Sequence, residues 1–186
     1  VWRMLNEQKT AEVSKFLKDV EAQVQACRSN IKAVEVYSCV LLKSASKNVK
    51  VAQTLLKNRA ELLFEVEAYA AAVDDCARAA RLRTSYSERH AEEPVTLQVE
   101  IWICQTRASL RLGNTQEAKT CLKDVTPTLE EAIKVAGLAG VDRSNLIKLS
   151  DKAVQWQDRA NKRESLVEEV RTDTARPGRS EEARQE

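Results

Sequence analysis

Residues Leu55 to Leu82 read LLKNRAELLFEVEAYAAAVDDCARAARL, and this stretch decides the fold. Small residues recur in it at the spacing of successive helical turns: Ala60 in the first half, and Ala72, Cys76 and Ala79 in the second. Short side chains at these intervals allow two helices to lie close together. The stretch therefore predicts a tightly packed helical hairpin, with a first helix over about residues 51–65.

Two further copies of this pattern flank the first, as expected for a repeat of about 34 residues. In the downstream copy, EIWICQTRASLRLGNTQEAKTCLKDV, Ala118, Leu122 and Val125 correspond to Ala72, Cys76 and Ala79. Its Gly113-Asn114 pair predicts the turn between the helices, because glycine adopts positive φ without steric cost. The upstream copy, NIKAVEVYSCVLL, is weaker and has Ala33, Tyr37 and Val40 at these places.

Composition supports an all-helical chain. Apolar residues make up 43% of the sequence and charged residues 31%, with only four Gly and three Pro to interrupt helices. The formal charge is +2 and the basic residues are spread along the chain, which argues against nucleic-acid binding. No signal peptide and no apolar run of about 18 residues occurs, so we expect a cytoplasmic or nuclear protein without a membrane span.

The fold we predict is all-α: a right-handed superhelix of three hairpins closed by a C-terminal capping helix. Its expected parts are an N-terminal helix extension (1–13), three repeats (14–132, as about 14–47, 53–86 and 99–132), a longer loop at 83–98, capping helices (133–170) and a disordered charged tail (171–186). A seam over Leu146, Leu149, Ala153, Trp156 and Ala160 predicts the capping helix, because a terminal repeat otherwise exposes its apolar side. A free coiled-coil arm is the alternative.

The pattern Asn58-Arg59-Ala60, Tyr69, Ala72 and Ala79 resembles the tetratricopeptide repeat, over roughly residues 14–132. The order of the pieces, from a degenerate first repeat through KNRAELLFEVEAYAAAVDDCARA and RASLRLGNTQEAKTCL to ANKRESLVEE, is similar to the N-terminal repeat region of SET and MYND domain-containing protein-lysine methyltransferases. That resemblance implies an enzyme that binds S-adenosylmethionine and zinc in parts that follow. It implies no catalytic, cofactor-binding or metal-binding residue in this segment. A stand-alone adaptor or co-chaperone is the alternative.

First helices of such repeats line the concave side of the superhelix, where a partner peptide binds. Extrapolating the register gives groove candidates at Lys15, Lys18, Thr54, Lys57, Asn58, Glu61, Glu65, Arg107 and Arg111, with Ala22, Glu100 and Cys104 also on this side. In related co-chaperones, Lys, Asn and Arg side chains grip the carboxyl terminus of heat-shock chaperones. Lys18 and Asn58 match that clamp, but Ala22, Glu100 and Cys104 do not, so we expect weak or absent binding of chaperone tails.

Other signals favour structural roles. The five cysteines lack paired spacing, which indicates reduced core thiols and no zinc site. His90 lies in a polar loop without a catalytic partner, and Asp74-Asp75 and Glu92-Glu93 are interpreted as solvated surface. Arg78, Arg81 and Arg83 lie near a helix end, where the helix dipole favours cations; a weak anion-binding patch is the alternative.

Overall fold

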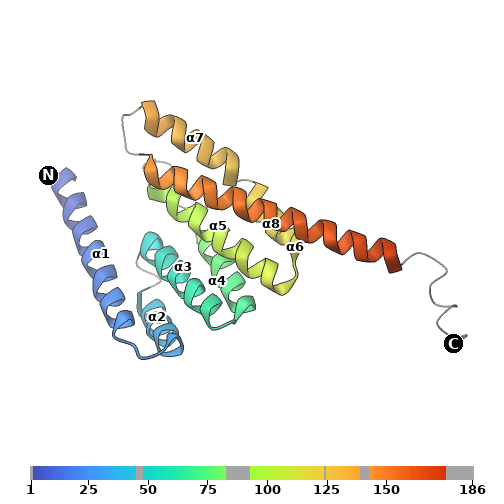
Figure 1. The fold of residues 1–186 in the computed structure, drawn as a ribbon. Helices are drawn as coiled ribbons and strands as arrows, with labels where there is room; N and C mark the ends of the chain where they lie inside the picture. The colour runs from blue at the N-terminus through green and yellow to red at the C-terminus, as the bar shows by residue number, and fades with distance from the viewer. Residues whose placement is uncertain (1, 45–47, 83–92, 124, 139–142, 175–186) are drawn as a thin grey trace, which may run out of the picture.

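The computed structural model describes residues 2–44, 48–82, 93–123, 125–138 and 143–174. Within these ranges the chain forms eight helices and no strand. The helices are α1 (Trp2–Gln25), α2 (Asn30–Ser44), α3 (Val49–Glu65), α4 (Tyr69–Leu82), α5 (Glu93–Leu112), α6 (Thr115–Lys123), α7 (Val125–Leu138) and α8 (Ser144–Thr174). Each of the first six helices packs on its neighbours in sequence, and α3 also contacts α5. The chain is a stack of helical hairpins with α1 and α8 at opposite sides (Figure 1), which confirms the predicted fold class.

The turns of the hairpins follow from local chemistry. Asn48 caps α3 by accepting a hydrogen bond from the backbone N–H of Val51, at 3.2 Å. Gly113 has φ of 87° at the end of α5, as its place in the sequence predicts, and the N–H of Asn114 then bonds to the carbonyl of Ser109 at 2.8 Å. This αL residue ends α5 and returns the chain into α6.

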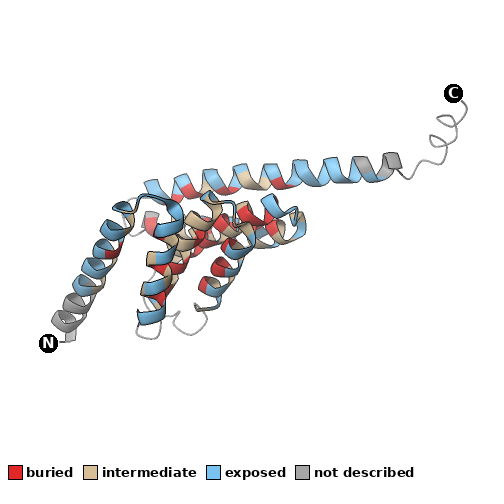
Figure 2. Cartoon of the chain, turned by 90° about the horizontal axis from the view of Figure 1, so that it is seen from below, coloured by how far each residue is buried: buried red, intermediate tan, exposed pale blue. Residues whose placement is uncertain are grey.

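Small side chains let the helices approach one another as predicted. Ala60, Ala72, Cys76, Ala79 and Ala118 have no exposed surface. The first four belong to one hydrophobic cluster, to which α1–α5 contribute. Figure 2 shows the buried positions on the facing sides of the helices, where the stack is closed.

A second hydrophobic cluster joins α5, α6, α7 and α8, and it explains the capping helix. Leu146, Leu149, Ala153 and Ala160 of α8 are buried, and Trp156 is half-buried. The seam predicted from the sequence therefore packs on α5, α6 and α7 of the same chain. Beyond Ala160, the described side chains of α8 are exposed, and this end of the helix extends past the stack (Figure 2).

Several boundaries differ from those expected. The predicted loop at 83–98 ends earlier, because α5 begins at Glu93 with Pro94 in its first turn, where a missing N–H has no cost. Residues 83–92, with His90 and Glu92, lie outside the described residues. The predicted tail from 171 is helical as far as Thr174, aided by an ion pair between Glu168 and Arg171, and residues 175–186 are not described. The expected N-terminal extension is continuous with the first helix of repeat one.

Candidate peptide-binding face

The first helices of the second and third repeats, α3 and α5, lie side by side, and α8 packs along α5. We call the surface formed by these three helices the α3–α5–α8 face. Lys57, Glu61 and Phe64 of α3, Glu100 and Arg107 of α5 and Trp156 of α8 mark it out. These side chains form two groups of different chemistry.

The first group is an ion-pair triad. The Nζ atom of Lys57 lies 3.2 Å from Glu61 and 3.1 Å from Glu100, and only 14% of the Lys57 side chain is exposed. Burial lowers the pKa of this ammonium, but the two carboxylates more than offset that effect and the pKa is raised overall. Two carboxylates face one ammonium, so the triad carries a net negative charge. That Glu100 opposes an incoming carboxylate stays a prediction.

Asn58 lies beside this triad and is engaged inside the chain. Its side chain hydrogen bonds to the hydroxyl of Tyr37, which reaches from α2 and is 4% exposed. Burial raises the pKa of Tyr37, whereas the bond from Asn58 opposes this rise. Asn58 therefore helps to join the first and second repeats, which is the role that competes with peptide binding.

The second group consists of arginines stacked on aromatic rings. The guanidinium carbon of Arg107 lies 4.3 Å from the ring centre of Phe64 and 5.9 Å from that of Trp156. Arg159 lies 4.4 Å from the same Trp156 ring, and Tyr69 packs edge-on against Phe64. Neither Arg107 nor Arg159 forms an ion pair with a carboxylate in the described part of the chain. Two arginines that form no ion pair with a described residue thus converge on one indole ring.

The structure distributes the predicted groove residues unevenly. Lys57 and Glu61 contact one another, and Arg107 lies on the same face. Thr54 donates its hydroxyl hydrogen to the carbonyl of Lys50 in the preceding turn. The remaining candidates are exposed and do not pair with a charged residue in the described part of the chain. They are Lys15, Lys18, Glu65 and Arg111. The role of all these residues in binding stays a prediction.

Sequence reasoning missed three residues of the face. Trp156 was interpreted only as part of the capping seam, and neither Phe64 nor Arg159 was selected. The seam places Trp156 on the buried side of α8, but it cannot say that α5 presents Arg107 to the ring. Cys104, expected on the groove side, is 2% exposed and lies beneath the surface, within the hydrophobic core.

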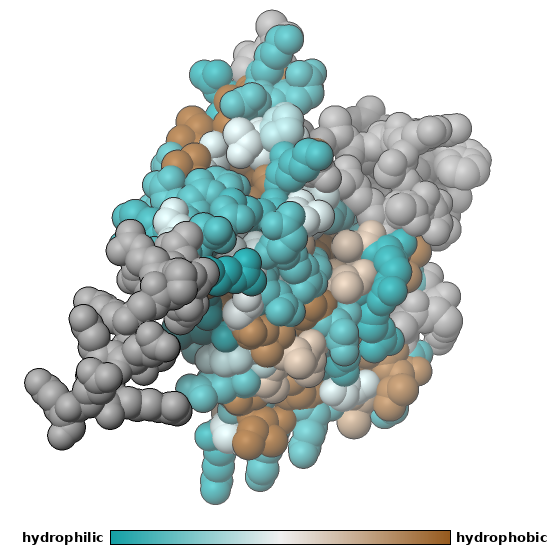
Figure 3. Space-filling view, turned by 90° about the vertical axis from the view of Figure 1, so that its right-hand side faces the viewer, coloured by the Kyte–Doolittle hydropathy of each residue, from teal (hydrophilic) through white to brown (hydrophobic). Residues whose placement is uncertain are grey.

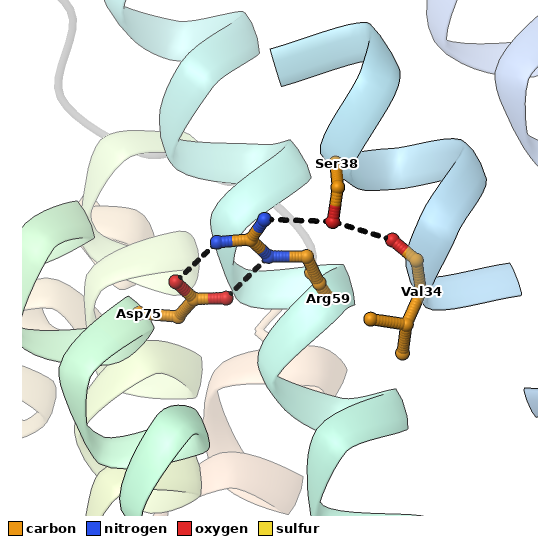
Figure 4. Close-up of polar contacts among 4 residues, drawn as sticks. All are labelled: Val34, Ser38, Arg59 and Asp75. Atoms are coloured by element: carbon orange, nitrogen blue, oxygen red, sulfur yellow. Dashed lines mark hydrogen bonds and ion pairs between the residues drawn. The ribbon is translucent and has the colours of Figure 1, made fainter. Parts of the chain in front are cut away.

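A buried polar network ties the second repeat together and corrects one expectation. Asp75, interpreted as solvated surface, is 3% exposed. Both of its carboxylate oxygens accept hydrogen bonds from Arg59 of α3, each at 2.6 Å. The third nitrogen of Arg59 donates to Ser38 of α2, which donates in turn to the carbonyl of Val34 (Figure 4). The carboxylate is buried because a cation from the neighbouring helix meets both oxygens.

The described residues contain no group of three or more His, Cys, Asp and Glu side chains arranged to hold a metal ion. None of the described helices combines the length and apolar character that crossing a membrane requires.

No protein-family model and no curated protein sequence matches the chain. Among solved structures, it is similar to the Hsp90 co-chaperone Cns1 from Saccharomyces cerevisiae (delta69), with a TM-score of 0.48 and 18% sequence identity. The match covers 89% of this chain and 46% of the other, so the chain spans less than half the length of the protein it matches. The assignment to stacked helical hairpins rests on the helix packing described above.

Proposed function

We propose that the chain is a protein-interaction module that binds a peptide segment of a partner on the α3–α5–α8 face. The observation that carries this proposal is the position of Arg107, held between the rings of Phe64 and Trp156 without a carboxylate partner among the described residues. A guanidinium stacked in this way keeps its N–H groups at the ring edge, where they can donate to an acidic side chain. The stacking also fixes the arginine before binding, which reduces the entropy lost when a ligand arrives.

The two ends of the face have opposite charge, and this gives the proposed peptide a direction. Arg107 and Arg159 supply positive charge at one end, and neither pairs with a carboxylate among the residues that the structure describes. The triad of Lys57, Glu61 and Glu100 has one negative charge in excess at the other end. A peptide with an Asp or Glu next to the arginines and a Lys, Arg or amide donor next to the triad complements both ends. The acidic group is a side chain, so a free carboxyl terminus is not required.

Panning a library of random peptides against the protein tests the proposal. Acidic residues should be enriched at one end of the selected peptides. Fluorescence polarisation of those peptides should then show about tenfold weaker binding to Arg107→Gln, equivalent to about 1.4 kcal/mol. The exposed Lys152 of α8 provides the matched control, because Lys152→Gln also removes one positive charge. Equal affinities for the two variants, at unchanged melting temperature, would contradict the proposal.

A finer proposal concerns the protein that carries these repeats. We propose that they form the non-catalytic N-terminal region of a SET and MYND domain-containing protein-lysine methyltransferase, whose catalytic parts would hold S-adenosylmethionine and zinc. The order of sequence segments alone supports this. The competing proposal is an adaptor or co-chaperone with no attached enzyme. The coding sequence beyond Glu186 distinguishes them: a cluster of Cys and His followed by a SET-type segment supports the enzyme, and their absence supports the adaptor.

A further inference from the structure

A cavity of about 650 Å³ opens between α2, α3 and α4. Its floor is apolar and consists of Leu41 on α2 with Ala52 and Leu56 on α3, all of them buried. The Arg59 side chain, fixed by Asp75 and Ser38, forms one wall. The volume lies in the range of protein ligand pockets, and none of the residues described above for the α3–α5–α8 face lines it.

The rim of this cavity combines an exposed leucine with arginines. Large apolar side chains reach the surface at several places in the described part of the chain, and Figure 3 shows such patches on one side of the molecule. Leu42 is the most exposed of them, at 89%, although it adjoins the apolar floor. Arg78 and Arg81 on α4 line the cavity from the other side and are both exposed. Covering Leu42 would remove apolar surface from water, which is favourable.

The electrostatics of the cavity favour one sign of partner. None of the described residues that line it is acidic, and Asp75, which contacts Arg59 in the network, is already bound by that arginine. Arg78 forms no ion pair with any residue that the structure describes. Arg78 and Arg81 are three positions apart on one helix, so both point to the same side of α4.

We propose that the cavity is a second docking surface, which takes an acidic amphipathic helix of a partner protein. A leucine-sized side chain of that helix enters the space above Leu41 and Leu56 and covers Leu42. A Glu or Asp side chain next to it meets Arg78. A helix suits this place because α2 and α4 form the two sides of a groove, and an amphipathic helix lays its apolar face into such a groove. The proposal uses other residues than the α3–α5–α8 face and does not depend on it.

The test uses synthetic helical peptides of about four turns. The probe has leucines along one face and glutamates on either side of them. One control peptide replaces each Glu by Lys, and another replaces each Leu by Ala. Fluorescence anisotropy should show saturable binding of the Leu and Glu peptide to the wild-type protein, and at least about tenfold weaker binding of both controls. Absence of saturable binding, or equal binding of the Lys peptide, would overturn the proposal.

Variants of the protein test whether the peptide binds in the cavity between α2, α3 and α4. Leu42→Glu and Arg78→Glu should each weaken binding of the Leu and Glu peptide at least about tenfold. Arg78→Gln should weaken it less. Val154→Glu and Lys152→Glu are matched controls on exposed positions of α8 and should leave the affinity unchanged. Arg107→Gln should also leave it unchanged, which separates this surface from the α3–α5–α8 face. If the controls weaken binding as much as Leu42→Glu does, or if Leu42→Glu has no effect, the proposal is wrong.

Discussion

Arg59 on α3 binds Asp75 on α4 through two hydrogen bonds of 2.6 Å, and its remaining nitrogen donates to Ser38 on α2 at 2.9 Å. One guanidinium therefore connects both helices of the second repeat and the last helix of the first. The carboxylate is 4% exposed and the guanidinium side chain 16%. A pair in this environment is costly to break, because the partner that remains is a buried, uncompensated charge.

Arg59→Met should lower the free energy of unfolding by about 3 to 5 kcal/mol, since it leaves the Asp75 carboxylate buried without a cation. Urea denaturation followed by circular dichroism measures this. Arg59→Met combined with Asp75→Leu should be less destabilised than the sum of the single variants. The surface pair of Glu168 and Arg171, at 3.9 Å, provides the control: Glu168→Gln should change stability by less than about 0.5 kcal/mol. Additive effects at Arg59 and Asp75 would contradict the role assigned to the pair.

Adjacent alanines at the start of α4 test whether small side chains are what lets the hairpins nest. Ala72 has no exposed surface, whereas Ala71 is exposed. Ala72→Leu should destabilise the protein by about 1 to 3 kcal/mol, because the added atoms have no space between α3, α4 and α5. Ala71→Leu should change the free energy of unfolding by less than about 0.5 kcal/mol. Thermal melts of both variants check the prediction, and equal melting temperatures would refute it.

The docking of α8 is tested by two neighbouring residues. Ala153 is 3% exposed and belongs to the hydrophobic cluster that α8 shares with α5, α6 and α7, whereas Val154 is 52% exposed. Ala153→Asp places a carboxylate in an apolar cluster and should lower stability by about 3 kcal/mol or more. Val154→Asp should have little effect. Limited proteolysis should cut α8 faster in the first variant than in the second, and the reverse order would mean that the seam does not hold the helix in place.

Thiol reactivity should follow burial. Cys39 is exposed, and Cys76 and Cys104 are buried. The pKa of Cys76 is raised mainly by a hydrogen bond with Cys104 and also by burial. Burial and the Glu117 carboxylate raise the pKa of Cys121 to about 11. At pH 8 these thiols are therefore protonated and unreactive. Iodoacetamide should modify Cys39 first and Cys76 only after unfolding in urea, as mass spectrometry of digested samples would show. Equal rates for Cys39 and Cys76 in the folded protein would contradict this order.

Periodic local signals predicted the hairpins, because spacing along one helix is set by the sequence alone. Ala72, Cys76 and Ala79 are buried where the pattern places them, and Gly113 forms the predicted turn. Cys39 was expected to be buried but is exposed, because it lies off the buried face of α2 that Ala33, Tyr37 and Leu41 form. Asp75 was misread because its partner lies 16 residues earlier on another helix, and only the register of the hairpin brings the two together.

The contact of Arg107 with Trp156 also could not be predicted from local sequence patterns, because the two residues lie far apart in the sequence. The sequence assigns each residue to a helix face, Arg107 to the groove side of α5 and Trp156 to the seam of α8. Whether the two faces meet depends on the angle at which α8 crosses α5, which no local pattern encodes. The structure shows the guanidinium 5.9 Å from the ring. Candidate residues could thus be found from the sequence singly, but not as a group.

Binding of acidic chaperone tails is expected to be weak, and the triad gives a way to reverse this. The resemblance to repeat co-chaperones predicts that Glu100 corresponds to a clamp position with a cation, and Lys57 is already paired with Glu100 and Glu61. A peptide with an acidic carboxyl-terminal motif should therefore bind with Kd no better than about 1 mM in a calorimetric titration. Glu100→Lys should strengthen binding at least about tenfold, because it removes one repulsive charge and adds an attractive one. If the same peptide is amidated at its carboxyl terminus, Glu100→Lys should not strengthen its binding, because the carboxylate is gone. Micromolar binding of the free peptide by the wild-type protein, abolished by Asn58→Ala, would show instead that the clamp is present.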